Sequence, residues 1–378
     1  MPRRSFAKIL TFFVVIVTAV GGALLWEIRS IPFFSSSSSN SNAAAASAAN
    51  ASLKVLHVLP SPSLPTASPI GPFEITFNQP IAGNSLTSLT ASQPGNWKVI
   101  NATTAVFTPV QPLMPDSSLT IKSSGRSSNQ IFATNGDYLA KPIDLSWNSA
   151  QGSVLRMQQI LAKLGFLPLV WRPTAPSSSV SPIEELYNPP PGNFTPRYPN
   201  TPTSLLASFQ PGVSNNLTKG AMVAFERSQG IAAYSSIRPL IWPALLNAEA
   251  AGVPNNNGYT YAMVSEALPE TITLWHDGTV VFTSPVNTGL AQTPTPNGTF
   301  YVYLRYPTQT MQGTNINGSY YVDHGVKWVN YINGSVAIHG FIRASYGFPQ
   351  SLGCVELPVA QAAIAWKWLH YGSVVNIS

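Results

Sequence analysis

Two residues near the C-terminus, His339 and Cys354, could together carry out nucleophilic catalysis. Cys354 is the only cysteine in the 378-residue chain. A thiol becomes a strong nucleophile when a neighbouring imidazole accepts its proton or stabilises the thiolate. The run 336–338 predicts a strand that delivers His339. Gly353, directly before the thiol, would let backbone N–H groups turn toward a developing oxyanion.

Structural roles for the same residues stay open when only residue types are considered. A single cysteine is more often a small buried hydrophobe than a nucleophile, and a single histidine is usually a satisfied polar group. His324, on an expected loop, is the main rival of His339 as a base. Phe341 and Arg343 lie between His339 and Cys354, where they could meet a substrate carboxylate or simply be solvated.

The segment from Ala337 to Pro358 resembles the signature of the L,D-transpeptidase (YkuD-type) catalytic domain: a strand ending in His-Gly, a loop, and then Ser-x-Gly-Cys-Val. The similarity extends roughly from Ala262 to Ser378. It includes a turn with proline and glycine at 293–300, and an expected helix at 359–369 followed by a last strand.

This resemblance implies a peptidoglycan-modifying acyltransferase. Cys354 would be the nucleophile, attacking the stem peptide before its terminal D-alanine, and His339 the general base and later acid. The carbonyl of Gly340 would orient the imidazole, and the N–H of Gly353 would bind the oxyanion together with that of Cys354, with the Leu352 N–H as a further candidate. The expected substrate-binding residues are Ser351, Leu352, Tyr321, His324, Trp328, Phe341 and Arg343.

Two positions depart from the family pattern. The family usually has histidine where this chain has Leu352, and arginine where it has Glu356. A carboxylate beside the thiol opposes thiolate formation. Three functions therefore stay open: an L,D-transpeptidase that forms 3-3 cross-links with an amine acceptor, which we favour; an L,D-carboxypeptidase that uses water; and an inactive, membrane-tethered wall-binding protein.

The N-terminus predicts membrane attachment. Arg3, Arg4 and Lys8 precede an uncharged run, 9–26, which as a helix would measure about 27 Å, near the thickness of the hydrocarbon core. We expect an uncleaved anchor at 1–30 with a cytoplasmic N-terminus, and a cleaved signal peptide is the alternative. A low-complexity Ser/Ala/Asn linker at 31–53 follows. The rest would face the wall of a bacterial cell.

The remaining chain predicts three modules and a mainly β fold with a small α module. Alternating strands at 54–150 are similar to bacterial immunoglobulin-like sandwiches. Helical spacing at 151–254 resembles a three-helix peptidoglycan-binding domain, with a Pro/Ser-rich insertion at 171–216 expected to be an extended loop. The segment 255–378 would be a YkuD-like β-sandwich, with an Asp277-Gly278 hairpin turn and one helix after Pro358.

Composition excludes some partners. The net charge of +6 forms no basic stripe with interleaved aromatic residues, so we predict no binding to nucleic acid. No pair of histidines or cysteines has the spacing of metal ligands, so we predict no metal and no cofactor. The expected partners are peptidoglycan stem peptides and the membrane.

Overall fold

The computed structural model describes residues 52–123, 130–175, 180–234 and 236–378. The described residues all belong to one unit. The expected anchor at 1–30 and most of the linker at 31–53 lie outside the described residues, so both stay predictions. None of the helices within the described ranges has the length and apolarity needed to cross a membrane.

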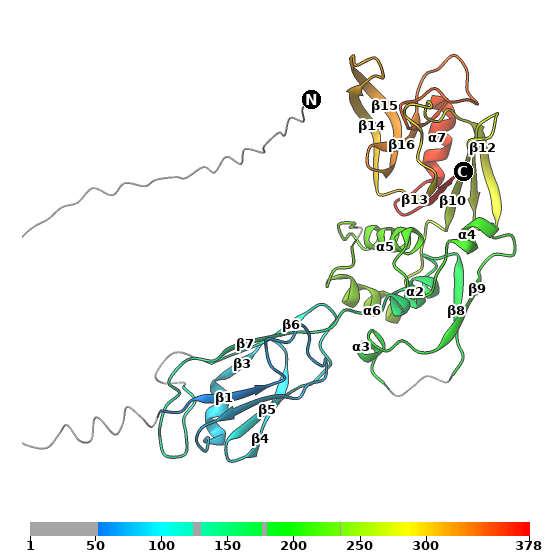
Figure 1. Ribbon diagram of the computed structural model, residues 1–378. Helices are drawn as coiled ribbons and strands as arrows, with labels where there is room; N and C mark the ends of the chain where they lie inside the picture. Colours follow the sequence, from blue (N-terminus) through cyan, green and yellow to red (C-terminus); the bar gives the residue numbers. More distant parts are fainter. Residues whose placement is uncertain (1–51, 124–129, 176–179, 235) are drawn as a thin grey trace, which may run out of the picture. The chain divides into compact units, whose positions relative to one another are not determined.

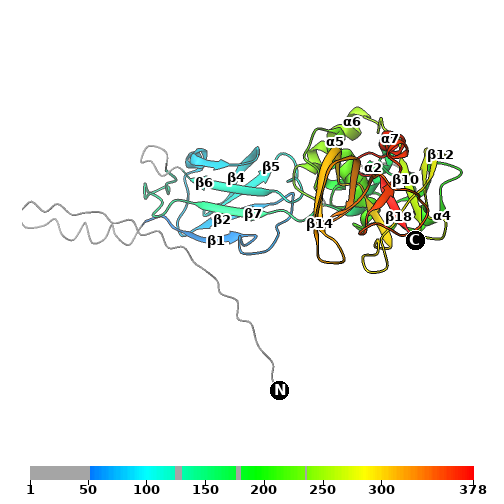
Figure 2. The same cartoon turned by 90° about the horizontal axis from the view of Figure 1, so that it is seen from above.

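The first described segment consists of two antiparallel sheets. One sheet has the strand order β1-β2-β5-β4 and the other β3-β6-β7. Phe73, Ile75 and Phe77 on β2 are buried while the residues between them are partly exposed, which is the predicted alternation. These side chains share one core with Trp147, whose ring packs 4.9 Å from that of Phe73. The elements are β1 (Val55–Leu59), β2 (Phe73–Phe77), η1 (Gly83–Ser88), β3 (Leu89–Ala91), β4 (Gly95–Asn101), β5 (Thr104–Pro109), β6 (Ser118–Ser123) and β7 (Asp144–Asn148). Figure 2 shows these strands running alongside one another. Their immunoglobulin-like assignment stays a prediction.

Three helices form where the helical spacing predicted them: α2 (Val154–Lys163), α5 (Asn216–Ser228) and α6 (Ile241–Ala251). Helices α2 and α5 each begin at a residue whose side chain caps the helix N-terminus. The side chain of Ser153 accepts from the Arg156 N–H at the start of α2, and that of Asn215 accepts from the Thr218 N–H at the start of α5.

The structure does not support a three-helix peptidoglycan-binding module. The prediction that the insertion at 171–216 is an extended loop is wrong in part. The insertion folds into β8 (Leu169–Pro173), α3 (Pro182–Glu185), β9 (Gly192–Pro196) and α4 (Thr203–Ala207), with β8 and β9 paired antiparallel. It buries Leu186 and Leu205 completely in the same core as the helices. These apolar side chains of the Pro/Ser-rich insertion are therefore core residues rather than parts of a solvated loop.

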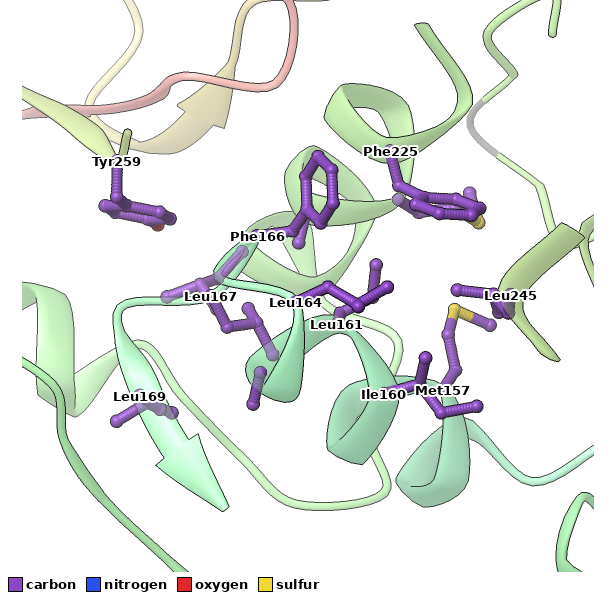
Figure 3. Packing of buried hydrophobic residues seen from close by; sticks show 14 of the residues in the cluster. Met157, Ile160, Leu161, Leu164, Phe166, Leu167, Leu169, Phe225, Leu245 and Tyr259 are labelled. Atoms are coloured by element: carbon purple, nitrogen blue, oxygen red, sulfur yellow. The ribbon is translucent and has the colours of Figure 1, made fainter. Parts of the chain in front are cut away.

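That core also includes residues beyond the helices. Figure 3 shows Met157, Ile160 and Leu161 of α2 lying near Phe225 of α5 and Leu245 of α6. Tyr261 and Val374, which belong to the C-terminal sheet, are part of the same cluster. The helices thus have no separate core of their own.

The C-terminal segment is built on two sheets, as expected for the mainly β fold. A five-stranded sheet has the order β12-β11-β10-β18-β13. Its strands are β10 (Thr260–Ser265), β11 (Thr271–His276), β12 (Thr279–Pro285), β13 (Gly298–Tyr301) and β18 (Val374–Ile377). The predicted hairpin turn between β11 and β12 is confirmed, since Asp277 and Gly278 have φ angles of 43° and 96°.

The second sheet has four strands in the order β14-β15-β16-β17. They are β14 (Leu304–Thr314), β15 (Tyr320–Asn333), β16 (Val336–Gly340) and β17 (Val355–Leu357). Strands β14 and β15 form a long hairpin, whereas β16 and β17 pair in parallel, which places His339 opposite Glu356. The predicted helix after Pro358 is α7 (Val359–Trp368), which packs on β15 and β16 (Figure 1).

Candidate active site

A cavity of about 1200 Å³ opens beside the four-stranded sheet and contains both His339 and Cys354. Five of the other residues singled out from the sequence also line it: Tyr321, Phe341, Arg343, Leu352 and Glu356. The hairpin of β14 and β15 supplies a further wall through residues 309–313 and 315–317, near the tip of the hairpin. The two groups with nucleophilic and basic chemistry therefore face one solvent-accessible space.

His339 is held by its position on the sheet. It is the fourth residue of β16 and is only 3% exposed. In the tautomer with its proton on Nδ1, the imidazole donates to the Gly340 carbonyl at 3.3 Å, which leaves Nε2 to accept a proton. Burial lowers the pKa of His339, while the Glu356 carboxylate opposes this shift. The imidazole at rest is thus a neutral base.

Cys354 lies directly before β17 and is partly buried. Its Sγ is 3.8 Å from the Ser335 carbonyl. Burial raises the pKa of the Cys354 thiol to about 11; a hydrogen bond to the backbone of Ala337 opposes this rise and the Glu356 carboxylate adds to it. The thiol is therefore protonated near neutral pH, and it needs a base to become a nucleophile.

Ser351 and Gly353 shape the turn that carries the thiol. Ser351 is fully buried, and its hydroxyl donates to the Cys354 carbonyl at 2.6 Å. The same hydroxyl accepts from the Gly353 N–H at 3.0 Å. Gly353 has a φ angle of 112°, which strongly favours glycine. Neither residue lines the cavity, and the Gly353 N–H expected to bind an oxyanion already has Ser351 as its partner.

A second loop, 287–295, supports this turn and the segment just before it, and the sequence analysis singled out only its end, as part of the turn at 293–300. Asn287 is fully buried, and its side chain accepts from the Gly347 N–H at 3.0 Å and donates to the Ser345 carbonyl at 3.2 Å. Thr295 donates to the Gly353 carbonyl at 3.1 Å. These polar residues look like ordinary loop positions in a chain rich in Asn, Ser and Thr, so only their long-range contacts reveal them.

Glu356 forms a bidentate ion pair with Arg343. The guanidinium Nε and Nη2 lie 2.7 Å and 2.8 Å from the two carboxylate oxygens. The side chain of Glu356 is 6% exposed and that of Arg343 is 30% exposed. The cation also lies 4.7 Å from the centre of the Phe341 ring, and this ring packs edge-on against His339. Arg343, expected to meet a substrate carboxylate, instead neutralises the acidic residue that departs from the family pattern.

Alternation along β15 decides which of its side chains reach the cavity. Tyr321 and Asp323 line it, whereas the intervening Val322 and the following His324 are exposed and do not. His324 instead lies 3.4 Å from the Thr310 hydroxyl across the hairpin. Trp328 also lies outside the cavity and packs its ring 5.7 Å from that of Trp366 on α7. The structure therefore does not bring the predicted His324 and Trp328 to the site, and it adds Asp323.

Gly340 follows His339 directly and packs against α7. It ends β16, it is buried, and a Cβ there would come within 3.1 Å of Ala362 and Val359 on α7. Because the helix approaches this closely, packing alone accounts for a glycine at position 340, with no catalytic role required. No group of three or more His, Cys, Asp or Glu side chains in the described ranges could hold a metal ion.

Comparison with known families identifies the segment that contains this cavity. Residues 259–377 match the YkuD model, described as the L,D-transpeptidase catalytic domain. No curated protein sequence matches the chain.

Solved structures similar to the chain are themselves L,D-transpeptidases. One from Mycobacterium smegmatis is 13% identical, with 87% of this chain and 100% of that chain covered and a TM-score of 0.29. L,D-transpeptidase 3 from Mycobacterium tuberculosis is 12% identical, with 86% and 98% covered and a TM-score of 0.30. The catalytic domain from E. faecium is 27% identical over 32% of this chain and 96% of that chain, with a TM-score of 0.29. The part of this chain that holds the cavity, residues 259–377, is thus the part that matches the YkuD family of L,D-transpeptidase catalytic domains.

Proposed function

We propose that this chain is a peptidoglycan L,D-transpeptidase that uses Cys354 as its nucleophile and His339 as its base. The observation that carries the proposal is the opening of both side chains into one cavity, within the segment that matches the L,D-transpeptidase catalytic domain. Among the solved structures similar to the chain, one is described as a complex with imipenem and one as a complex with a faropenem-derived adduct.

The first half-reaction begins from two neutral groups. Because the pKa of Cys354 is raised to about 11 and that of His339 is lowered, a preformed thiolate–imidazolium pair is disfavoured. His339 therefore takes the thiol proton as sulfur attacks the carbonyl before the terminal D-alanine of the stem. The imidazolium then gives this proton to the departing amine, and a thioester remains on Cys354.

The developing oxyanion needs backbone donors. With the Gly353 N–H directed at Ser351, the N–H groups of Leu352 and Cys354 are the remaining donors in the turn. A backbone donor needs no particular side chain, so leucine in place of the usual histidine leaves this function intact. Losing one such donor typically costs about 2.7–4 kcal/mol of transition-state stabilisation, which makes the geometry of the turn as important as the thiol.

The Arg343–Glu356 ion pair favours an active enzyme over the inactive alternative. An unpaired carboxylate beside the thiol would hinder thiolate formation, but the guanidinium in contact with both oxygens of Glu356 offsets part of that charge. The departure from the family at Glu356 is thus accompanied by a compensating residue.

The proposal includes a location, because peptidoglycan lies outside the cytoplasm. Residues 1–30 would attach the chain to the membrane with the catalytic segment on the wall side. Protease digestion of intact spheroplasts should then degrade residues 52–378, whereas cytoplasmic proteins should survive.

Intact-mass spectrometry tests the activity. Imipenem should add one equivalent to the purified chain at Cys354, and Cys354→Ala should abolish the adduct. His339→Ala should slow its formation by about 100-fold or more, as expected for loss of a general base. A disaccharide-tetrapeptide should then yield a cross-linked dimer with release of D-alanine. Release of D-alanine without dimer would identify a carboxypeptidase, and a chain that forms neither adduct nor product would be inactive.

A further inference from the structure

Among the described residues that line the catalytic cavity, one charged side chain forms no ion pair. Its charged lining residues are Asp323, Arg343 and Glu356. Arg343 and Glu356 neutralise each other through their bidentate ion pair. No ion pair or hydrogen bond engages the Asp323 carboxylate among the residues that the structure describes. The charged side chains of the cavity therefore leave one negative charge, carried by Asp323.

The strand directs this carboxylate into the cavity. Asp323 and Tyr321 are two residues apart on β15, so both side chains leave the same face, and both line the cavity. Asp323 is half-buried and pairs with Met311 across the hairpin. Burial is the main cause of the raised pKa of Tyr321 and of the lowered pKa of His339, and the Asp323 charge adds a smaller contribution to the first shift and opposes the second. The same charge also contributes to raising the pKa of Arg343, so it acts across the cavity.

We propose that Asp323 binds the ammonium group of the acceptor amine and thereby favours transfer over hydrolysis. This role rests on the proposed function and names the substrate group that the site recognises. A partly desolvated carboxylate makes strong, charge-assisted hydrogen bonds with a primary ammonium and repels anions. The arginine that would attract an anionic group is already occupied by Glu356. The cavity is thus suited to a cationic partner.

The transfer step balances with the groups present. The acceptor amine, as R–NH₃⁺, must lose two protons to become an amide nitrogen. One passes through neutral His339 to solvent as the amine attacks the thioester carbonyl and a C–N bond forms. When the C–S bond breaks, the sulfur takes the second proton and regenerates the Cys354 thiol. Asp323 takes no part in bond making, and its contribution is to hold the ammonium before deprotonation.

The single cysteine allows the charge preference to be measured without any catalytic turnover. Methanethiosulfonate reagents that carry an aminoethyl cation or a sulfonatoethyl anion would modify only Cys354. The ratio of their rates reports the electrostatic preference of the cavity, because any change in thiolate fraction affects both reagents equally. Asp323→Asn should lower the cation-to-anion ratio by about fivefold or more, and 1 M salt should reduce the ratio in the wild type.

Glu266→Gln is the matched control. It also removes one carboxylate from the C-terminal segment, it does not line the cavity, and its carboxylate forms no hydrogen bond or ion pair with the described residues that line the cavity. Its rate ratio should equal that of the wild type. A ratio unchanged by Asp323→Asn would overturn the cation subsite, whatever the enzymatic activity of the chain.

Kinetics with a disaccharide-tetrapeptide and a separate amine acceptor complete the test. Asp323→Asn should raise the acceptor KM by about tenfold and increase hydrolysis relative to transfer, while the rate of acylation by imipenem stays within twofold. Asp323→Glu should restore part of the acceptor KM. If the wild type shows the reagent preference but forms no cross-link, the transpeptidase proposal fails and the cation subsite stands. If acylation falls in parallel with transfer, Asp323 acts on the donor step and the acceptor role is wrong.

Discussion

At the scale of single residues, one cavity is lined by a thiol and an imidazole that both favour their neutral forms. Both states have the same cause, because burial disfavours the charged form of each group. Cys354 thus depends on His339 for activation during the reaction rather than before it. This arrangement predicts that small alkylating reagents and acylating substrates respond differently to pH.

We expect alkylation of Cys354 by iodoacetamide to rise about tenfold per pH unit up to pH 10 and to level off near the pKa of about 11. An ordinary thiol levels off near its pKa of about 8.5. Acylation by imipenem should instead be fast already near pH 6.5, because it needs only neutral His339, whose pKa is lowered. Stopped-flow mass spectrometry over pH 6–11 would measure both rates. A plateau of alkylation near pH 8 would contradict the buried, base-dependent thiol.

The Arg343–Glu356 pair gives a second prediction. In Arg343→Gln, the Glu356 carboxylate loses its ionic partner although its side chain is only 6% exposed. Removing one member of a fully buried pair costs about 3–5 kcal/mol, and because Arg343 is 30% exposed we expect a loss of about 2 kcal/mol in the free energy of unfolding. Acylation should also slow, since the bare carboxylate raises the pKa of the thiol further.

Urea denaturation would measure this loss, with Lys122→Gln as the control. Lys122 forms an ion pair with Asp144 in which both side chains are mostly exposed, so its loss should cost less than about 1 kcal/mol. The double variant Arg343→Gln, Glu356→Gln should recover part of the stability. Equal midpoints for Arg343→Gln and Lys122→Gln would show that this pair contributes no more to stability than an exposed ion pair.

At the scale of elements, the turn before β17 depends on one hydroxyl. Ser351→Ala would leave the Gly353 N–H and the Cys354 carbonyl without their shared partner in a fully buried position. We expect a loss of about 2 kcal/mol in the free energy of unfolding and acylation by imipenem slower by about tenfold or more. Denaturation and intact-mass kinetics measure the two effects. Ser265→Ala, whose hydroxyl makes one exposed hydrogen bond, should change neither.

Regular elements could be predicted from the sequence because their causes are local. Alternation in 73–77, the Asp277-Gly278 turn and the apolar period of 154–163 each act within a few residues. The His-Gly and Ser-x-Gly-Cys patterns likewise indicated the site residues, which lie on β16 and directly before β17.

The features that could not be predicted from the sequence depend on contacts between residues far apart in the chain. Asn287 and Thr295 support a turn some 58–60 residues away, and Arg343 meets Glu356 across the loop. Asp323 and His324 are adjacent in sequence, and only the register of β15 decides that the acid rather than the imidazole faces the cavity. The Pro/Ser-rich composition of 171–216 also concealed two leucines that belong to the core.

At the scale of the molecule, the helices and the C-terminal sheets share a core and should unfold together. Helix α5 packs on β13 and β18, and a Cβ at Gly220 would come within 2.8 Å of the Gly372 carbonyl and 3.1 Å of Tyr301 Cβ. Gly220→Val should therefore cost about 2 kcal/mol through overpacking, although it lies outside the catalytic cavity.

Two probes would test this coupling. Far-ultraviolet circular dichroism and pulsed alkylation of Cys354 should give coincident urea transitions for Gly220→Val, both shifted from the wild type. Gly83→Ala, where a Cβ meets only Val99 at 3.9 Å, should leave the Cys354 transition unchanged. Separate transitions for the two probes would show that the C-terminal sheets fold independently of the helices.

The burial of the Cys354 sulfur has a further consequence, for chemical durability. Peroxides attack the thiolate, and the chain has no second cysteine with which a sulfenic acid could condense to a protective disulfide. A thiol with a pKa of about 11 presents almost no thiolate to such oxidants at neutral pH. An enzyme proposed to work beyond the reducing cytoplasm would thus keep its only thiol unoxidised between turnovers and expose its reactivity only when substrate fills the cavity.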